Sequence, residues 1–172
     1  MKTMTNKGFT LIELLAVIAI FGVISTIILS ILVIGFRGGK KSDLLNTIRQ
    51  NGDIAMSQME RKIRYAQSLN TPASCVSTQS DLSAIAITSL DDNVQTTYTC
   101  SGTTIASNGA SLIDSTAFTV SSCSFSCSQP TVADPPTVVI QFTLSSKTTN
   151  NFIESNASIP FQTSVTMRNV NQ

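Results

Sequence analysis

Four cysteines are the side chains best equipped for covalent chemistry in this chain. They stand at Cys75, Cys100, Cys123 and Cys127, all in the Ser/Thr-rich second half. An even number of cysteines in a domain of exported appearance favours disulfides. Zinc is the competing use, and it is disfavoured because the chain has no histidine and no C-x-x-C pair. We therefore expect two disulfides and no metal site.

Catalytic chemistry has few candidates. Histidine, the commonest general base, is absent, and charged residues make up 12% of the 172 residues. Serines are abundant, but without histidine or a Ser-x-x-Lys they imply no nucleophile. Asp91-Asp92-Asn93 lacks the glycine and distal glutamate of a calcium loop, so we interpret it as a turn. We expect no catalytic residue, no cofactor and no small-molecule substrate.

Glu13 is the only charged residue between Gly8 and Phe36. The 23 uncharged residues from Leu14 to Phe36 are enough to cross a hydrocarbon core of ~30 Å as a helix. A carboxylate at the centre of a bilayer costs about 2.5–3.5 kcal/mol and usually has a partner. A simpler interpretation is that Glu13 lies in the first turns of a helix, where the dipole favours negative charge and the side chain reaches headgroups.

The residues around Glu13 form a specific short motif. After a polar leader with Lys2 and Lys7, the chain reads Lys7-Gly8-Phe9-Thr10-Leu11-Ile12-Glu13-Leu14-Leu15. This segment resembles the type IV pilin-like superfamily, which comprises pilins, minor pilins and the pseudopilins of type II secretion. The resemblance covers residues 7–15.

The resemblance implies processing followed by assembly. A prepilin peptidase that is also an N-methyltransferase would remove the leader peptide, residues 1–8, by cutting between Gly8 and Phe9, and would methylate the amine of Phe9. Glu13 would then pair with the Phe9 amine of a neighbouring subunit and set the register of the packed helices. Other pilin subunits and an inner-membrane assembly platform are the further implied partners. The chain would first span the cytoplasmic membrane once, with its head outside, and then enter an extracellular or periplasmic filament.

Residues 9–36 are expected to form the transmembrane and assembly helix, and residues 37–70 an amphipathic helix. Apolar residues recur at three- and four-residue steps from Leu45 to Ala66. We expect this helix to end near Asn70, because Pro72 disfavours helix in the residue before it.

The glycines between these two segments leave two interpretations open. Gly35-Phe36-Arg37-Gly38-Gly39 could be a hinge or melted turn, in which case Ser42 would cap the second helix. The alternative is that the glycines only lower the local stability of the helix, which tolerates them.

Residues 71–172 are expected to form a Ser/Thr-rich antiparallel β head. Short β-like runs occupy 84–90, 94–100, 103–107 and 116–122, and the clearest alternation of apolar and polar residues covers 138–145 and 161–168, with a polar linker at 147–158. The sequence thus predicts an α+β fold, in which a long N-terminal helix packs through residues 44–67 against one antiparallel sheet.

Three pairings of the four cysteines are possible. We expect Cys75–Cys100, which would tie the segment after the helix to the first hairpin. Cys123–Cys127 would then close a tight loop. Spacing alone does not exclude the other two pairings.

Charge is distributed unevenly and bears on the choice of function. Residues 1–64 hold nine basic and four acidic residues, net +5, whereas residues 65–172 hold two and six, net −4. The one basic cluster in the membrane-distal part of the expected mature chain, Arg61-Lys62-x-Arg64, is more typical of a solvated helix face than of a DNA contact. We expect a structural subunit of a pilus-like or secretion filament. A minor pilin for DNA uptake and an anchored extracellular protein that never polymerises are the alternatives.

Overall fold

The computed structural model describes residues 8–147 and 156–168, so most of the expected leader and most of the 147–158 linker lie outside the described residues. The chain divides into two compact units, Met1–Lys40 and Lys41–Gln172. One helix, α1 (Leu11–Arg64), begins in the first unit and ends in the second. The described strands all belong to the second unit: β1 (Ala66–Thr71), β2 (Gln79–Leu82), β3 (Ala84–Ser89), β4 (Gln95–Ser101), β5 (Thr104–Ser107), β6 (Ala110–Ser111), β7 (Phe118–Ser128), β8 (Thr137–Ser146) and β9 (Ser158–Thr166).

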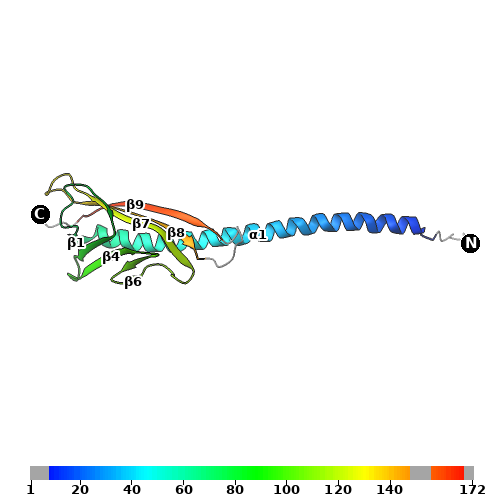
Figure 1. The fold of residues 1–172 in the computed structure, drawn as a ribbon, viewed down its shortest axis with the longest axis horizontal. Helices are drawn as coiled ribbons and strands as arrows, with labels where there is room; N and C mark the ends of the chain where they lie inside the picture. The colour runs from blue at the N-terminus through cyan, green and yellow to red at the C-terminus, as the bar shows by residue number, and fades with distance from the viewer. Residues whose placement is uncertain (1–7, 148–155, 169–172) are drawn as a thin grey trace, which may run out of the picture. The chain divides into compact units, whose positions relative to one another are not determined.

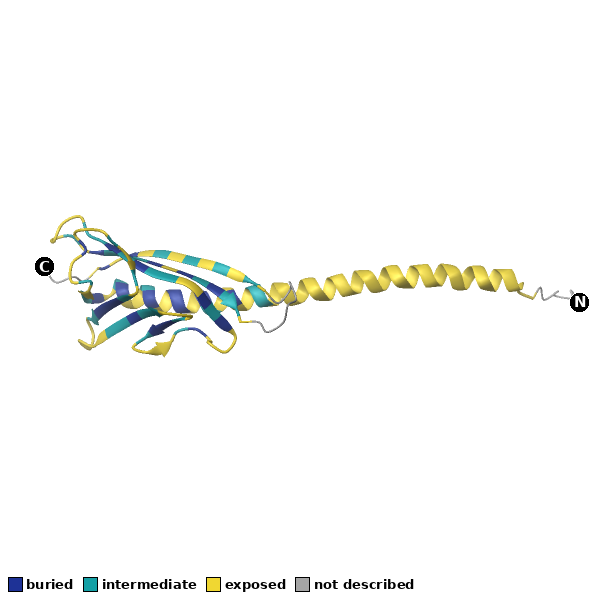
Figure 2. Cartoon of the chain, viewed as in Figure 1, coloured by how far each residue is buried: buried dark blue, intermediate teal, exposed yellow. Residues whose placement is uncertain are grey.

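In the first unit every described residue is exposed, as the uniform colour of this part of α1 shows (Figure 2). Residues 35–39 are helical like their neighbours, so the expected melted turn is absent here and Ser42 lies inside a helix instead of capping one. A helix-interior glycine costs only about 1 kcal/mol relative to alanine, which an established helix tolerates.

In the second unit α1 is amphipathic, as its sequence period predicts. Ile48, Ala55, Met59 and Ile63 have no exposed surface and lie four or seven residues apart along one face. They join the single hydrophobic core of the unit, together with residues of both sheets. The expectation that this part of the helix packs against the β head is confirmed.

The helix ends at Arg64, six residues before the expected Asn70. The next residues form β1, which pairs antiparallel with β3 and sets Leu69 opposite Ile87. The carbonyl oxygen of Arg64 accepts a hydrogen bond of 3.0 Å from the backbone N–H of Arg168, so a segment distant in sequence caps the helix. Pairing with a strand outweighs local helical preference here.

The strands form two antiparallel sheets where one was expected. One sheet has the order β1-β3-β4-β5-β6 and the other the order β2-β7-β8-β9. In the view of Figure 1, β9 and β7 run along one side of the C-terminal part of α1, and β4 and β6 along the other. Six of the strands match runs expected from sequence, whereas β1, β2 and β6 were missed. The α+β class with a long N-terminal helix is confirmed.

Both disulfides form, but with partners that differ from the expected ones. Cys75 pairs with Cys127, and Cys100 pairs with Cys123, with Cα–Cα distances of 5.4 and 5.6 Å. Cys123 and Cys127 lie four residues apart on the same strand, β7. An extended strand separates such residues by about 13 Å, which is too far for a disulfide. The expected Cys123–Cys127 bond, and with it Cys75–Cys100, is therefore wrong.

Gly52 is a point of close approach between α1 and the sheet β2-β7-β8-β9. The ring of Phe161 in β9 lies directly over it, so that a Cβ at position 52 would overlap the ring carbons. The same ring stacks on Phe142 of β8, with the ring centroids 5.1 Å apart. Gly52 therefore allows an aromatic pair to lie against the helix backbone.

Replacing Gly52 by alanine is expected to destabilise the second unit by about 1–3 kcal/mol, because the added methyl must displace Phe161 from a packed core. Thermal and denaturant unfolding of the full chain in detergent, followed by circular dichroism, would measure the change. Gly39→Ala is the matched control: its Cβ position is open, so it should stabilise the helix by up to about 1 kcal/mol. Equal stability of Gly52→Ala and the wild type would contradict the packing.

The cysteine pairing can be read from unreduced peptides. Cleavage before aspartate separates the segments that carry Cys75 and Cys100 from the one that carries Cys123 and Cys127, and cleavage after Phe125 divides the last two. We expect mass spectrometry to find peptides of Cys75 joined to Cys127 and peptides of Cys100 joined to Cys123. A peptide pair joining Cys123 to Cys127 would contradict the structure.

Candidate functional site

The Gly8–Phe9 peptide bond lies immediately before the helix. Neither residue is helical, both are exposed, and the Phe9 side chain keeps 82% of its surface accessible. Glycine has no side chain to hinder an approaching protease. The bond is therefore sterically open to cleavage, and a cut there would leave α1 intact with Phe9 as the new first residue.

Thr10 and Glu13 form a reciprocal cap at the start of α1. The backbone N–H and the hydroxyl of Thr10 each donate to Glu13 Oε2, both at 3.1 Å, and the N–H of Glu13 donates to Thr10 Oγ1 at 3.4 Å. This is the capping-box arrangement, in which a threonine and a glutamate three residues apart satisfy free backbone groups of the first turn. In the isolated chain Glu13 thus has a local structural role, in line with the simpler interpretation of this residue.

A capping role for Thr10 was not predicted from the sequence, although a signal for it was present. A threonine followed three residues later by glutamate, just before an apolar run, is the pattern of a capping box. The structure brings Thr10 and Glu13 together next to the Gly8–Phe9 bond. The four cysteines lie in the second unit as structural disulfides.

The apolar run of the first unit is long and apolar enough for α1 to cross a membrane. Its few hydroxyl groups are satisfied within the helix: Ser25, Thr26 and Ser30 donate to the carbonyl oxygens of residues three or four positions earlier, at 2.7–2.8 Å. The large apolar side chains are exposed throughout, and this described part of the chain offers them no partner. Covering this surface requires lipid or other chains.

Several described charged groups of the second unit make local contacts. Arg64 pairs with Glu60 one helical turn away, which removes one member of the basic cluster. Asp91-Asp92-Asn93 is a turn, as expected: the Ser89 N–H donates to the Val94 carbonyl at 3.0 Å. The N–H of Val94 donates a hydrogen bond to the Asp92 carboxylate. This bond, a hydrogen bond with the side chain of Ser89 and the positive charge of Lys62 together hold the pKa of Asp92 below its usual value. Residues 8–147 and 156–168 contain no group of three metal-ligating side chains.

Comparison with known proteins gives one finding. Residues 3–29 match the prokaryotic N-terminal methylation motif, which is the signal of type IV pilins. No curated protein and no solved structure gives a significant match to the chain. The N-terminal segment is therefore pilin-like, and the match does not extend to the second unit.

Replacing Thr10 by valine removes a hydroxyl that both donates to Glu13 and accepts from it. The first turn of α1 should lose about 0.5–2 kcal/mol of stability, the usual cost of a lost N-cap. Amide hydrogen exchange of the full chain in micelles should then be faster at residues 11–14. Thr26→Val, which removes a hydroxyl bonded within the helix interior, should leave these residues unchanged. Unaltered exchange in Thr10→Val would argue against the cap.

Proposed function

We propose that this chain is a structural subunit of a type IV pilus-like filament or of a type II secretion pseudopilus, as a minor pilin or pseudopilin. The observation that supports this proposal most strongly is the exposed apolar helix that follows a methylation motif at residues 3–29. Prepilin peptidase would cut between Gly8 and Phe9 and methylate Phe9. Before assembly the subunit would span the cytoplasmic membrane with its head outside. It would then enter the filament through an assembly platform.

Burial of residues 9–36 among neighbouring helices would drive polymerisation. Each subunit that leaves the bilayer exchanges lipid contacts for contacts with other helices, so close packing has to supply the gain. The small residues of this segment, including Gly22 and Ser30, are of the kind that permits such close approach.

Glu13 would fix the axial position of each subunit. Its Oε2 atom holds the Thr10 cap, while within the described residues no hydrogen bond reaches Oε1. A carboxylate held in this way can accept a second donor without first giving up the cap. The Phe9 amine of a neighbouring subunit, created by the same cleavage, is the donor that we assign to it.

The two alternative functions have less support. A DNA-uptake role calls for a basic head, whereas residues 65–172 are net −4 and Arg64 is paired with Glu60. A protein that is anchored but never polymerises has no use for cleavage before its apolar run. The mass of the processed chain separates this last case from the proposal.

The intact mass of the protein from its own membranes should correspond to loss of residues 1–8 and gain of one methyl group. A Gly8→Val variant is the control, since a branched side chain beside the scissile bond should block cleavage and leave the full chain. A wild-type chain that is neither cut nor methylated would overturn the proposal.

Glu13→Gln keeps the size of the side chain but removes its charge. We expect filaments, counted by electron microscopy and by pelleting of sheared material, to fall by about tenfold or more, because the unpaired Phe9 amine would be left in a low-dielectric environment. Glu60→Gln removes a carboxylate from the surface of the second unit and should assemble normally. Wild-type assembly of Glu13→Gln would contradict the role in register.

A further inference from the structure

The surface of the second unit has a hollow of about 370 Å³ that the filament role does not use. It lies between the C-terminal end of α1 and the turn that joins β3 to β4. Its lining combines cations, a carboxylate, a hydroxyl, an aromatic ring and an aliphatic side chain: Arg61, Lys62, Tyr65, Ser89, Leu90 and Asp91. Its size is within the range of small-ligand sites.

The charged lining of this hollow consists of two cations, Arg61 and Lys62, and one carboxylate, Asp91. The charge of Lys62 also acts on the carboxylate of Asp92 in the adjoining turn. The guanidinium of Arg61 forms no ion pair or hydrogen bond with any described residue. A basic residue in the last helical turn also complements the helix dipole. A guanidinium that is unpaired and lines a hollow is, in addition, available for a bidentate contact with one carboxylate.

The apolar side of the hollow consists of Tyr65 and Leu90. They keep 51% and 47% of their surfaces exposed. A half-exposed tyrosine beside polar groups suits a ligand with one apolar face and a polar edge. A pyranose ring has this character, because its C–H face is apolar and its hydroxyls lie around the rim.

We propose that the hollow binds an acidic sugar, that is, a pyranose that carries a carboxylate. The guanidinium of Arg61 pairs with the carboxylate of the sugar. Tyr65 and Leu90 contact the face of the sugar ring, and Asp91 accepts hydrogen bonds from its hydroxyls. The assignment does not depend on filament assembly, since every residue in it belongs to one chain.

A neighbouring hollow of about 230 Å³ extends the same surface. It shares Arg61 and Lys62 with the first and adds uncharged hydrogen-bonding side chains, among them Gln58, Thr96 and Asn108. Amide and hydroxyl groups of this kind suit further sugar hydroxyls. The pair of hollows therefore fits an oligosaccharide, with its acidic unit placed at Arg61.

A nucleic acid fits these features less well. Each added phosphate would approach Asp91, Asp92 and a region of net −4, and the lining of this hollow offers two cations, Arg61 and Lys62, to neutralise them. A single carboxylate on an otherwise neutral ligand avoids this repulsion.

The test is a titration of the full chain in uncharged detergent, followed by NMR shifts of residues 61, 65 and 89–91. Digalacturonate and N-acetylneuraminate are the acidic probes, neutral galactobiose the uncharged one, and a duplex DNA the polyanion. We expect saturable binding of at least one acidic sugar, and which one binds identifies a uronate or a sialic acid source. Galactobiose and DNA should bind at least tenfold more weakly.

Two substitutions and a control separate the proposed contacts. Arg61→Gln should weaken acidic-sugar binding by about tenfold or more, because it removes a charge-assisted hydrogen bond. Tyr65→Ala should weaken it as well, while Tyr65→Phe keeps the ring and retains most of the affinity. Arg49→Gln, at an exposed position of α1 outside both hollows, should have no effect.

Three results would overturn the proposal: no saturable binding of either acidic sugar, affinity unchanged in Arg61→Gln, or DNA bound more tightly than the sugars and lost in Arg61→Gln. The binding is measured on the unassembled chain, so failure here would leave the proposed filament role untouched.

Discussion

The second unit depends on one buried stripe of α1. Ile48, Ala55, Met59 and Ile63 have no exposed surface and belong to the core that both sheets share. Without this stripe the two sheets would lose the element that fills the space between their apolar faces. Gly52 lies on the same stripe, and its missing side chain leaves room for Phe161. The helix therefore determines how closely the second sheet approaches.

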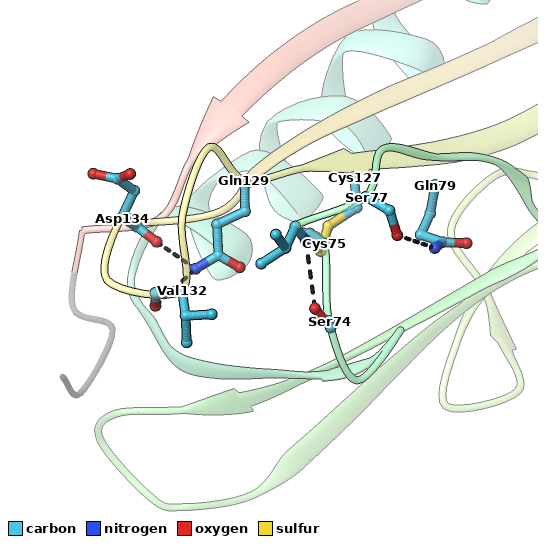
Figure 3. The surroundings of a disulfide bond; sticks show 9 residues. Ser74, Cys75, Ser77, Gln79, Cys127, Gln129, Val132 and Asp134 are labelled. Carbon is cyan, nitrogen blue, oxygen red and sulfur yellow. Dashed lines mark hydrogen bonds between the residues drawn. A yellow bond between two sulfur atoms is a disulfide. The ribbon is translucent and has the colours of Figure 1, made fainter.

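Covalent bonds reinforce this arrangement at two places. Cys100–Cys123 joins β4 of one sheet to β7 of the other, and Cys75–Cys127 ties the segment after β1 to the same strand. Around Cys127 the loop that follows β7 is held by the side chain of Gln129, which donates to the carbonyl oxygens of Val132 and Asp134 (Figure 3). A head of modest size gains stability from such cross-links, because its core alone buries a limited apolar area.

The two parts of α1 differ in how their apolar side chains are distributed around the helix. From residue 41 onward apolar side chains occupy one face and polar ones the other, as expected for a helix between a core and water. In the first unit apolar side chains surround the helix, and Glu13, the only charged residue between Gly8 and Phe36, is hydrogen-bonded to Thr10. Such a surface suits lipid or the apolar helices of other subunits, and the methylation motif at residues 3–29 agrees with that use.

Much of this could be predicted from the sequence, since the relevant signals are local. The apolar run, the motif around Gly8 and Glu13, the helical period from Leu45 to Ile63 and the alternation in β8 and β9 each depend on neighbouring residues. The Thr10–Glu13 cap had an equally local signal, although it was overlooked.

Other features were decided by contacts between residues distant in sequence. The end of α1 at Arg64 depends on the pairing of β1 with β3, and the disulfide partners depend on which strands face one another. The division into two sheets and the hollow beside Arg61 follow in the same way. These features are set by the packing of strands against a helix, which composition and spacing do not encode. The sequence by itself therefore determined the long helix, six of the strands and the N-terminal motif, and the tertiary structure decided the other strands and which residues meet.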